Sequence, residues 1–196
     1  MTNPYAIGRR VYLRAPTAED AAGRWHEWFS DPETTQYMSD RYWPNTPERQ
    51  KEFLDGLQRS QASLVLSILE KDTNELIGVC SLGAINWVHR YADFAVVIGE
   101  RKYRNGQIAL EVVSLLLETA FLRLNLLNVK GGFMESNGLT EAILKIFGFD
   151  VIGRFKGLCF HKGTYVDLVC VQLNRETWLR RNRERTSAGR QEPVGS

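Results

Sequence analysis

The amino-acid sequence predicts a single α/β domain with a mixed, mostly antiparallel sheet and flanking helices. Three observations support this class. Several short runs are rich in β-branched and aromatic residues, or alternate apolar with polar side chains, which is typical of strands. Other segments carry apolar residues at helical spacing. The two kinds of segment are interleaved along one chain of 196 residues, of which 43% are hydrophobic, so the chain can bury one core of ordinary size.

The first half of the chain is expected to form one strand and two short helices. Residues 9–16 alternate apolar and polar side chains, as a half-buried strand does. Thr17 is a favourable N-cap for the helix that follows, and Pro32 ends that helix. A polar, aromatic loop then leads to a second helix, which is expected to begin near Pro47.

The second half of the chain is expected to be richer in strands. Three β-rich runs joined by turn residues predict an antiparallel meander at residues 63–70, 76–85 and 92–99. The remaining elements are a long helix with an apolar stripe, a strand, a short helix and a last strand, expected at residues 109–124, 127–135, 140–148 and 165–173.

The charge and the hydropathy pattern indicate neither a nucleic-acid nor a membrane partner. The formal net charge is +2, so no extensive basic surface is expected. No window holds the roughly 18 uninterrupted apolar residues of a membrane-spanning helix, and the N-terminus lacks the layout of a signal peptide. We therefore expect a cytoplasmic protein that is a monomer or a homodimer.

The cysteines and the C-terminus limit the organisation of the chain further. The three cysteines are an odd number, widely spaced and without a CxxC pair, so neither a disulfide framework nor a metal site is expected. The domain is expected to cover residues 8–174. Residues 175–196 are charged and lack an extended apolar stripe, so they are expected to form a partly disordered tail.

The segment GERKYRNG, residues 99–106, places three cations directly before the long helix. The first N–H groups of a helix have no internal partner, and together with the helix dipole they attract anions. The two glycines allow an anion to approach the backbone, and Arg101, Lys102 and Arg104 add positive charge. A bound phosphate explains this arrangement, and from the local residues alone a solvated, charged turn explains it equally well.

A longer pattern separates these two explanations. The segment RNGQIA at residues 104–109 is similar to the pyrophosphate signature Q/R-x-x-G-x-G/A of the GCN5-related N-acetyltransferase (GNAT) family. The segment SNGLTEAILKIFGF at residues 136–149 resembles that family's N-x-x-S/A…G-F segment in an ungapped register. Gln107 replaces the internal glycine of the signature. The resemblance covers residues 96–149 closely and the first half of the chain only in element order.

The resemblance implies a fold, a cofactor and a reaction. In this family two central strands splay apart, and acetyl-CoA binds in the gap and donates its acetyl group to an amine. Here those strands would be FAVVIG and NVKGGFM, so a GNAT-like domain with splayed central strands is expected. The resemblance implies that acetyl-CoA is held by Val96, Val97, Ile98, Arg104, Asn105, Gly106, Gln107, Ile108, Ala109, Asn137 and Thr140.

Transfer to an amine needs a base for the acceptor and an acid for the departing thiolate. Many members of the family use a Tyr of the last helix as the acid, and Leu144 stands at the matching position. His89 has a suitable ordinary pKa and Asp93 lies beside the expected cofactor strand, so both are candidate bases. Glu135 and Ser136, at the end of the neighbouring strand, are further candidates. All four also suit structural roles in turns, strands or helix caps.

The sequence indicates the acceptor amine less specifically than it indicates the cofactor. The segment GAINWVHRYADFAVVIG resembles a branch of the family that acetylates amino sugars, often linked to nucleotides, so we expect a small-molecule amine as acceptor. Its candidate contacts are Trp43, Trp87, Arg90 and Tyr91. One alternative is N-terminal acetylation of a protein, as in the ribosomal-protein acetyltransferases. Another is a CoA-binding module without catalysis, which the residues at positions 107 and 144 would suit.

Overall fold

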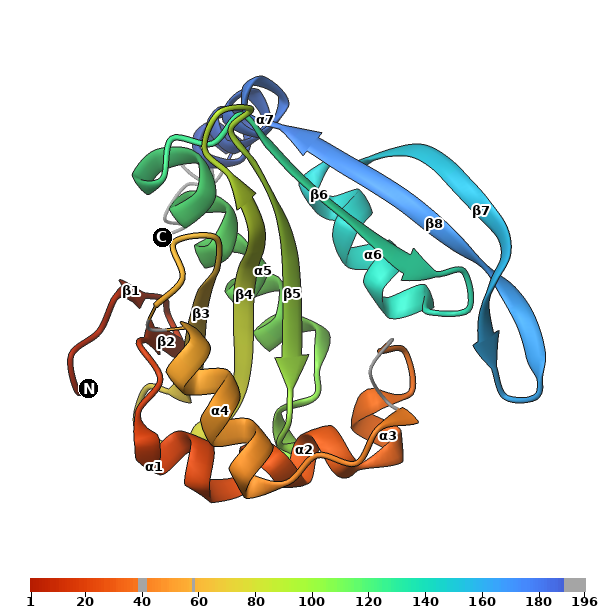
Figure 1. The fold of residues 1–196 in the computed structure, drawn as a ribbon. Coiled ribbons are helices and arrows are strands. Elements are labelled where there is room, and N and C mark those ends of the chain that lie inside the picture. The colour runs from red at the N-terminus through yellow and green to blue at the C-terminus, as the bar shows by residue number, and fades with distance from the viewer. Residues whose placement is uncertain (39–41, 58, 189–196) are drawn as a thin grey trace, which may run out of the picture.

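The computed structural model describes residues 1–38, 42–57 and 59–188. Within them, eight strands form one sheet in the order β1-β2-β3-β4-β5-β6-β8-β7 (Figure 1). Neighbouring strands pair antiparallel except β5 and β6, which pair parallel. The strands are β1 (Ala6–Ile7), β2 (Val11–Arg14), β3 (Leu64–Glu70), β4 (Leu76–Asn86), β5 (Tyr91–Ile98), β6 (Asn128–Met134), β7 (Asp150–His161) and β8 (Thr164–Asn174).

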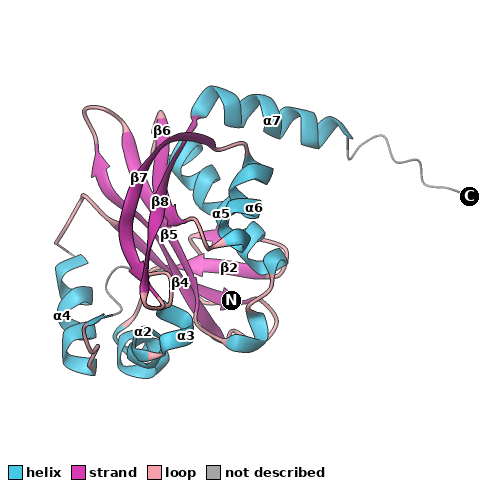
Figure 2. Ribbon diagram, turned by 90° about the vertical axis from the view of Figure 1, so that its right-hand side faces the viewer, coloured by secondary structure: helices cyan, strands magenta, loops and turns pink. Residues whose placement is uncertain are grey.

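Helices lie on both faces of the sheet. Figure 2 shows α5 and α6 on one side of the strands and α4 on the other. The helices are α1 (Ala18–Asp20), α2 (His26–Ser30), α3 (Pro32–Thr35), α4 (Pro47–Leu57), α5 (Gly106–Glu118), α6 (Gly138–Phe147) and α7 (Arg175–Ala188). A π-helical turn at residues 21–25 joins α1 to α2, and another at 119–123 extends α5. Among the described residues, no helix combines the length and apolar character needed to cross a membrane.

The two faces of β5 contact different parts of the core. Phe94, Val96 and Ile98 pack against the main core, which lies between the sheet and the helices α5 and α6. Val97 packs against a smaller cluster on the opposite face, which includes Trp28 of α2. This is the alternation of side chains along a strand that is covered on both faces.

The strands β5 and β6 pair over only three rungs. The last of them joins Asp93 to Lys130, and beyond it the two strands diverge, as Figure 1 shows. β6 stays paired with β8 along its whole length, so it is the contact with β5 that ends. Residues 94–98 therefore have β4 on one side and no strand on the other. This confirms the expected splayed central strands and the predicted α/β class.

A capping box fixes the start of the first helix to the sheet. The hydroxyl of Thr17 accepts the N–H of Asp20, and the Asp20 carboxylate accepts the N–H of Thr17. Asp20 is buried, and it also receives two hydrogen bonds from Arg14 and one from the hydroxyl of Ser67. Burial acts to raise the pKa of Asp20, but these donors outweigh it and hold that pKa below its ordinary value.

The first part of the C-terminal segment, which was expected to belong to a partly disordered tail, is helical. Arg175–Ala188 form the helix α7. Trp178 is only 4% exposed, and its ring lies 5.4 Å from that of Phe121 in the main core. Leu179 also packs against this core. The charged residues around the two hid this contact, because two adjacent apolar residues make no periodic stripe. The end of the expected tail, residues 189–196, lies outside the described residues.

Candidate active site

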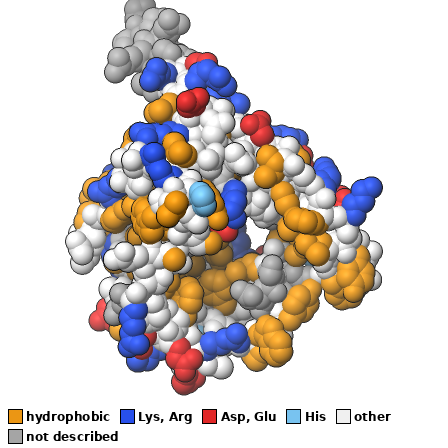
Figure 3. Space-filling model, turned by 45° about the horizontal axis from the view of Figure 1, so that its top comes forward, with side chains coloured by type: hydrophobic (Ala, Val, Ile, Leu, Met, Phe, Trp, Pro, Cys, Tyr) orange, Lys and Arg blue, Asp and Glu red, His pale blue; other side chains and the backbone are white. Residues whose placement is uncertain are grey.

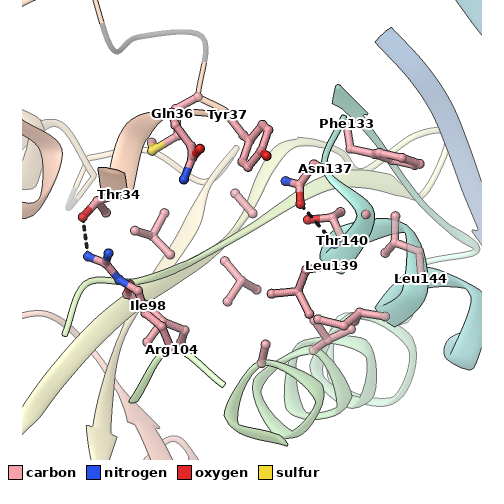
Figure 4. Close-up of a pocket in the computed structure, with 18 of the residues that line it drawn as sticks. Thr34, Gln36, Tyr37, Ile98, Arg104, Phe133, Asn137, Leu139, Thr140 and Leu144 are labelled. Atoms are coloured by element: carbon pink, nitrogen blue, oxygen red, sulfur yellow. Dashed lines mark hydrogen bonds between the residues drawn. The ribbon is translucent and has the colours of Figure 1, made fainter. Parts of the chain in front are cut away.

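A cavity of about 630 Å³ lies where β5 and β6 diverge. Residues 94–98 of β5 form one wall, Gly132 and Phe133 of β6 another, and the starts of α5 and α6 border it. Figure 3 shows one face of the molecule hollowed, with mostly hydrophobic side chains inside the hollow. Figure 4 shows side chains from α3, from the loop before α5 and from α6 directed toward a common space.

Backbone groups of β5 face this cavity. The N–H of Gly99 donates to the carbonyl of Ile77 on β4 (2.9 Å). Because N–H and C=O groups alternate sides along a strand, residues 97 and 95 also point their backbone groups to β4. The backbone groups of Phe94, Val96 and Ile98 therefore point into the gap. In agreement, the carbonyl of Ile98 accepts a hydrogen bond from Arg104 Nε (3.1 Å).

Two helices begin at the cavity, and each has an asparagine N-cap. Asn105 accepts the N–H of Ile108 at the start of α5, and Asn137 accepts the N–H of Thr140 at the start of α6. Both asparagines and Thr140 line the cavity. An added Cβ on Gly106 would meet only Leu139 Cδ1, at 3.9 Å, so space is open beside this backbone. The structure thus places the N-termini of both α5 and α6 at the cavity.

Gln107 does not occupy the cavity. Its side-chain oxygen accepts a hydrogen bond from Arg10, on the other side of α5 from the lining residues. The next turn of the helix is held in the same way, because Glu111 Oε1 accepts the N–H groups of Arg10 and Val11. The glutamine in place of the signature glycine therefore leaves the space beside the helix start open.

Arg104 is held by protein groups on several sides. Its guanidinium donates to the carbonyls of Ile98 and Gly99 and to the hydroxyl of Thr34, and it forms ion pairs with Asp31 and Glu33. Figure 4 shows the bond to Thr34, which joins two residues of the cavity lining. The side chain thus joins the end of β5 to α3. Among the cofactor contacts expected from the sequence, Arg104 has this additional, structural role.

The carboxylate of Asp31 supplies a negative charge that pairs with Arg104 between β5 and α3. Asp31 accepts hydrogen bonds from the Thr34 hydroxyl (2.7 Å), the N–H of Glu33 and Arg104. These donors, with the Thr34 hydroxyl first, lower the pKa of Asp31 to about 2. Because the carboxylate is ionised at every pH well above that value, its ion pair with Arg104 persists through the neutral range. The other two cations of the loop are also paired, Arg101 with Glu33 and Lys102 with Glu75.

Gly99 is required by packing and not by a ligand. A Cβ at this position would lie 2.0 Å from a ring atom of Trp28, which is an impossible contact. The indole N–H of Trp28 donates to the buried carboxylate of Glu100 (3.1 Å), and Arg24 pairs with the same carboxylate. The close approach of Trp28 therefore explains why the segment GERKYRNG, residues 99–106, begins with a glycine.

Most of the other residues that the sequence led us to expect at the cofactor lie together at the cavity. Val96, Val97, Ile98 and Ala109 line the cavity with the residues already named. Ile108 does not, because its side chain is 4% exposed and belongs to the main core.

The candidate bases lie at three different places. Asp93 closes the last rung between β5 and β6, and its carboxylate pairs with Lys130 Nζ at 2.6 Å. His89 lies on the exposed turn before β5, where its ring stacks beside that of Tyr91. Glu135 accepts the N–H of Asp167 and pairs with Arg154 of the β7–β8 hairpin. Ser136, the fourth candidate, follows Glu135 directly in the chain. The lining of the cavity includes none of the four side chains, and Asp93 is the one adjacent to it.

The expected acceptor residues are not gathered at the cavity. Trp43 is 68% exposed, and the indole N–H of Trp87 donates to the carbonyl of Gln61. Arg90 donates twice to the carbonyl of Asn125, at 2.8 and 2.5 Å, which fixes the turn before β5. Tyr91 contacts the side chains of His89 and Lys130. The structure thus places these residues around the turn and loops and not in the lining.

Residues after α3 line the cavity and were missed by the sequence analysis. Gln36, Tyr37 and Met38 form part of its wall. Tyr37 stacks on His161 of the β7–β8 hairpin at 5.1 Å, and its hydroxyl donates to the carbonyl of Ser136 (3.3 Å). These partners are about a hundred residues away along the chain. No local pattern in the loop QYM signals such a contact.

Comparison with known proteins agrees with this arrangement. The family model described as an acetyltransferase (GNAT) domain matches residues 10–150. The chain belongs to the GNAT acetyltransferase family. It is therefore an acetyl-CoA-dependent N-acetyltransferase of the GNAT type.

Relatives and solved structures resemble this GNAT enzyme over most of its length. The uncharacterized N-acetyltransferases p20 of Bacillus licheniformis and YoaA of Bacillus subtilis are 26% and 27% identical, over 84% and 81% of this chain and 92% and 89% of their own. The fold is similar to that of a spermidine N-acetyltransferase from Vibrio cholerae, solved with CoA and spermine, with a TM-score of 0.79. That likeness has 20% identity and covers 87% of this chain and 98% of the other.

The cavity of the GNAT enzyme fits acetyl-CoA. The Asn105 cap occupies the N–H of Ile108, so the N–H groups of Gly106 and Gln107 are the ones available to pyrophosphate oxygens beside the open space at Gly106. The gap-facing backbone of Phe94 and Val96 suits the amides of an extended pantetheine chain, which can bind as an added strand does. When bound, acetyl-CoA supplies an acetyl group activated as a thioester.

Proposed function

We propose that this GNAT enzyme acetylates the primary amine of an amino sugar, held at the wall formed by α3 and residues 36–38, against which the end of β7 packs. The observation that carries the proposal is the closure of this side by aromatic contacts. Tyr37 stacks on His161, and Tyr42 Oη donates to the carbonyl of Phe160 (2.7 Å). A cavity whose wall is held in place by such contacts suits a small molecule better than a protein N-terminus, which needs an open groove.

The charges at the wall favour an acceptor with a neutral body. Glu33 is the acidic member of the lining residues, and it is already paired with Arg101 and Arg104. Gln36, Tyr37 and Asn137 supply neutral polar groups that suit sugar hydroxyls. A polyamine, such as the spermine bound by the Vibrio cholerae enzyme, would call for unpaired carboxylates. Arg90 is bonded to a carbonyl, so an unlinked amino sugar is favoured over a nucleotide-linked one.

We propose three parts for the chemistry. The N–H of Val96 lies beyond the last β5–β6 rung and faces the gap, and a donor there stabilises the negative charge that develops on the thioester oxygen during attack. Asp93 accepts the proton of the amine, directly or through a water molecule, because its carboxylate stands at the end of the same gap. Leu144 carries no proton to give, so the departing thiolate takes its proton from water.

An acceptor screen tests the proposed substrate. The purified enzyme is incubated with acetyl-CoA and one of five amine classes: amino sugars, nucleotide-linked amino sugars, polyamines, amino acids or peptides, and thiol release is followed. Glucosamine-type sugars are expected to give at least about tenfold higher kcat/KM than spermidine or peptides, a difference of about 1.4 kcal/mol. A preference for spermidine would move the acceptor to the polyamine class, and release with a peptide alone would contradict the small-molecule proposal.

Asp93→Asn is expected to lower kcat roughly 10²- to 10⁴-fold, because that is the usual contribution of general-base catalysis. The affinity for acetyl-CoA, measured by calorimetry, should stay within about twofold, since the side chain is outside the cavity lining. His89→Ala is the matched comparison from the neighbouring turn and should cost much less. Equal losses in the two variants would place the base elsewhere.

A further inference from the structure

One helical turn beyond Ala109 on α5 and Thr140 on α6, and on the facing strands, part of the cavity lining consists of hydrocarbon side chains. We call these residues, Val113, Phe133, Ile143, Leu144 and Val171, the apolar recess. They come from α5, β6, α6 and β8, and each is at most 8% exposed. Because they line a cavity, they are buried from solvent and yet border open space.

The register of the strands places the apolar recess near the closed end of the gap. Val171 pairs with Gly131 on β6, and a Cβ on Gly131 would lie 3.1 Å from the ring of Phe94. Phe94 is the first residue after the last β5–β6 rung. The helix start at Asn105 lies at the other end of β5. A cofactor laid along β5 from Asn105 therefore has its thioester end beside the apolar recess.

We infer that the apolar recess accepts acyl chains longer than acetyl, so that the enzyme transfers propionyl, butyryl and longer straight-chain groups as well. The inference rests on the proposed function, because it takes the same cavity as the thioester site. The amine nitrogen bonds to the carbonyl carbon, the carbon–sulfur bond breaks, the amine proton goes to Asp93 and the thiolate takes a proton from water. The products are an N-acyl amide and CoA for every chain length.

The physical reason is the burial of methylene groups. Moving one methylene from water into an apolar site contributes about 0.8 kcal/mol, which is roughly a fourfold gain in affinity. A chain that ends in a carboxylate is expected to bind poorly, because the apolar recess offers that charge no partner. The donor preference should therefore depend on both length and charge.

Calorimetric titration of the full chain with a series of thioesters tests the inference without an acceptor. Relative to acetyl-CoA, propionyl-CoA should bind about fourfold and butyryl-CoA about fifteenfold more tightly. Succinyl-CoA should bind at least about tenfold more weakly than butyryl-CoA. Affinities that stay level or fall from acetyl to butyryl would overturn the inference while leaving the acetyl-CoA site intact. Absence of acetyl-CoA binding would instead refute the proposed function.

Two substitutions of Leu144 test whether the acyl chain binds in the apolar recess. Leu144→Phe fills part of the apolar recess, so the butyryl-to-acetyl affinity ratio should fall toward one. Leu144→Ala enlarges it and should move the optimum toward hexanoyl-CoA. Ile146→Phe is the matched control, because Ile146 lies on the same helix with 46% exposure and outside the cavity lining, and it should keep the wild-type ratio. A wild-type ratio in both Leu144 variants would show that the chain binds elsewhere and that the inference is wrong.

Discussion

Ala109→Phe is expected to weaken acetyl-CoA binding at least about a hundredfold, which corresponds to about 2.7 kcal/mol. Ala109 lies on the first turn of α5 and lines the cavity next to the capping residue Asn105. An aromatic ring there fills the space beside the helix backbone. The pyrophosphate and the adjoining part of the pantetheine chain would otherwise lie in that space. The affinity is measured by calorimetric titration of the full chain with acetyl-CoA.

Glu118→Phe provides the control for this prediction. It introduces the same side chain on the same helix at an exposed position outside the cavity lining. Its affinity for acetyl-CoA should stay within about twofold of the wild-type value, as is usual for surface substitutions. Similar affinities in the Ala109 and Glu118 variants would mean that the cofactor does not approach the start of α5, and the proposed site would have to be abandoned.

Trp178→Ala is expected to lower the free energy of unfolding by about 3–5 kcal/mol, the usual cost of removing a large buried aromatic side chain. Trp178 is 4% exposed and packs against Phe121, so truncation leaves a cavity between α7 and the end of α5. Because the total stability of a domain is only about 5–15 kcal/mol, this loss is a large fraction of it. Urea denaturation measures the change.

Arg180→Ala is the comparison for Trp178. Arg180 lies on the same helix and is exposed, so its replacement should change the free energy of unfolding by no more than about 0.5 kcal/mol. If the two substitutions had equally small effects, α7 would not be part of the folded core. The C-terminal segment would then be the loosely held tail that its charge pattern suggests.

The parts of the fold that follow from short-range patterns were predictable from the sequence. Thr17 signals the start of the first helix by its chemistry alone, and the capping box bears this out. The three β-rich runs and the apolar stripe of α5 likewise depend on residues close together in the chain. The divergence of β5 and β6 followed only from the family resemblance, since no residue pattern within either strand marks it.

The roles that depend on distant partners were not predictable. Besides the cofactor contact expected of it, Arg104 has a structural role, since its guanidinium bonds to Thr34, 70 residues earlier, and to Asp31. Gly99 was read as an opening for an anion, whereas the ring of Trp28 requires it. The acceptor wall depends on the stacking of Tyr37 on His161, which joins segments that are far apart. Local sequence carries no information about such pairs.

A crystal structure of the enzyme with bound CoA tests the central claim most directly. We expect pyrophosphate oxygens within hydrogen-bond distance of the N–H groups of Gly106 and Gln107. We also expect a pantetheine chain along the gap-facing backbone of Phe94 and Val96, with the thiol beside the apolar recess. CoA bound away from the gap between β5 and β6, or a phosphate held only by the side chains of the loop before α5, would contradict it.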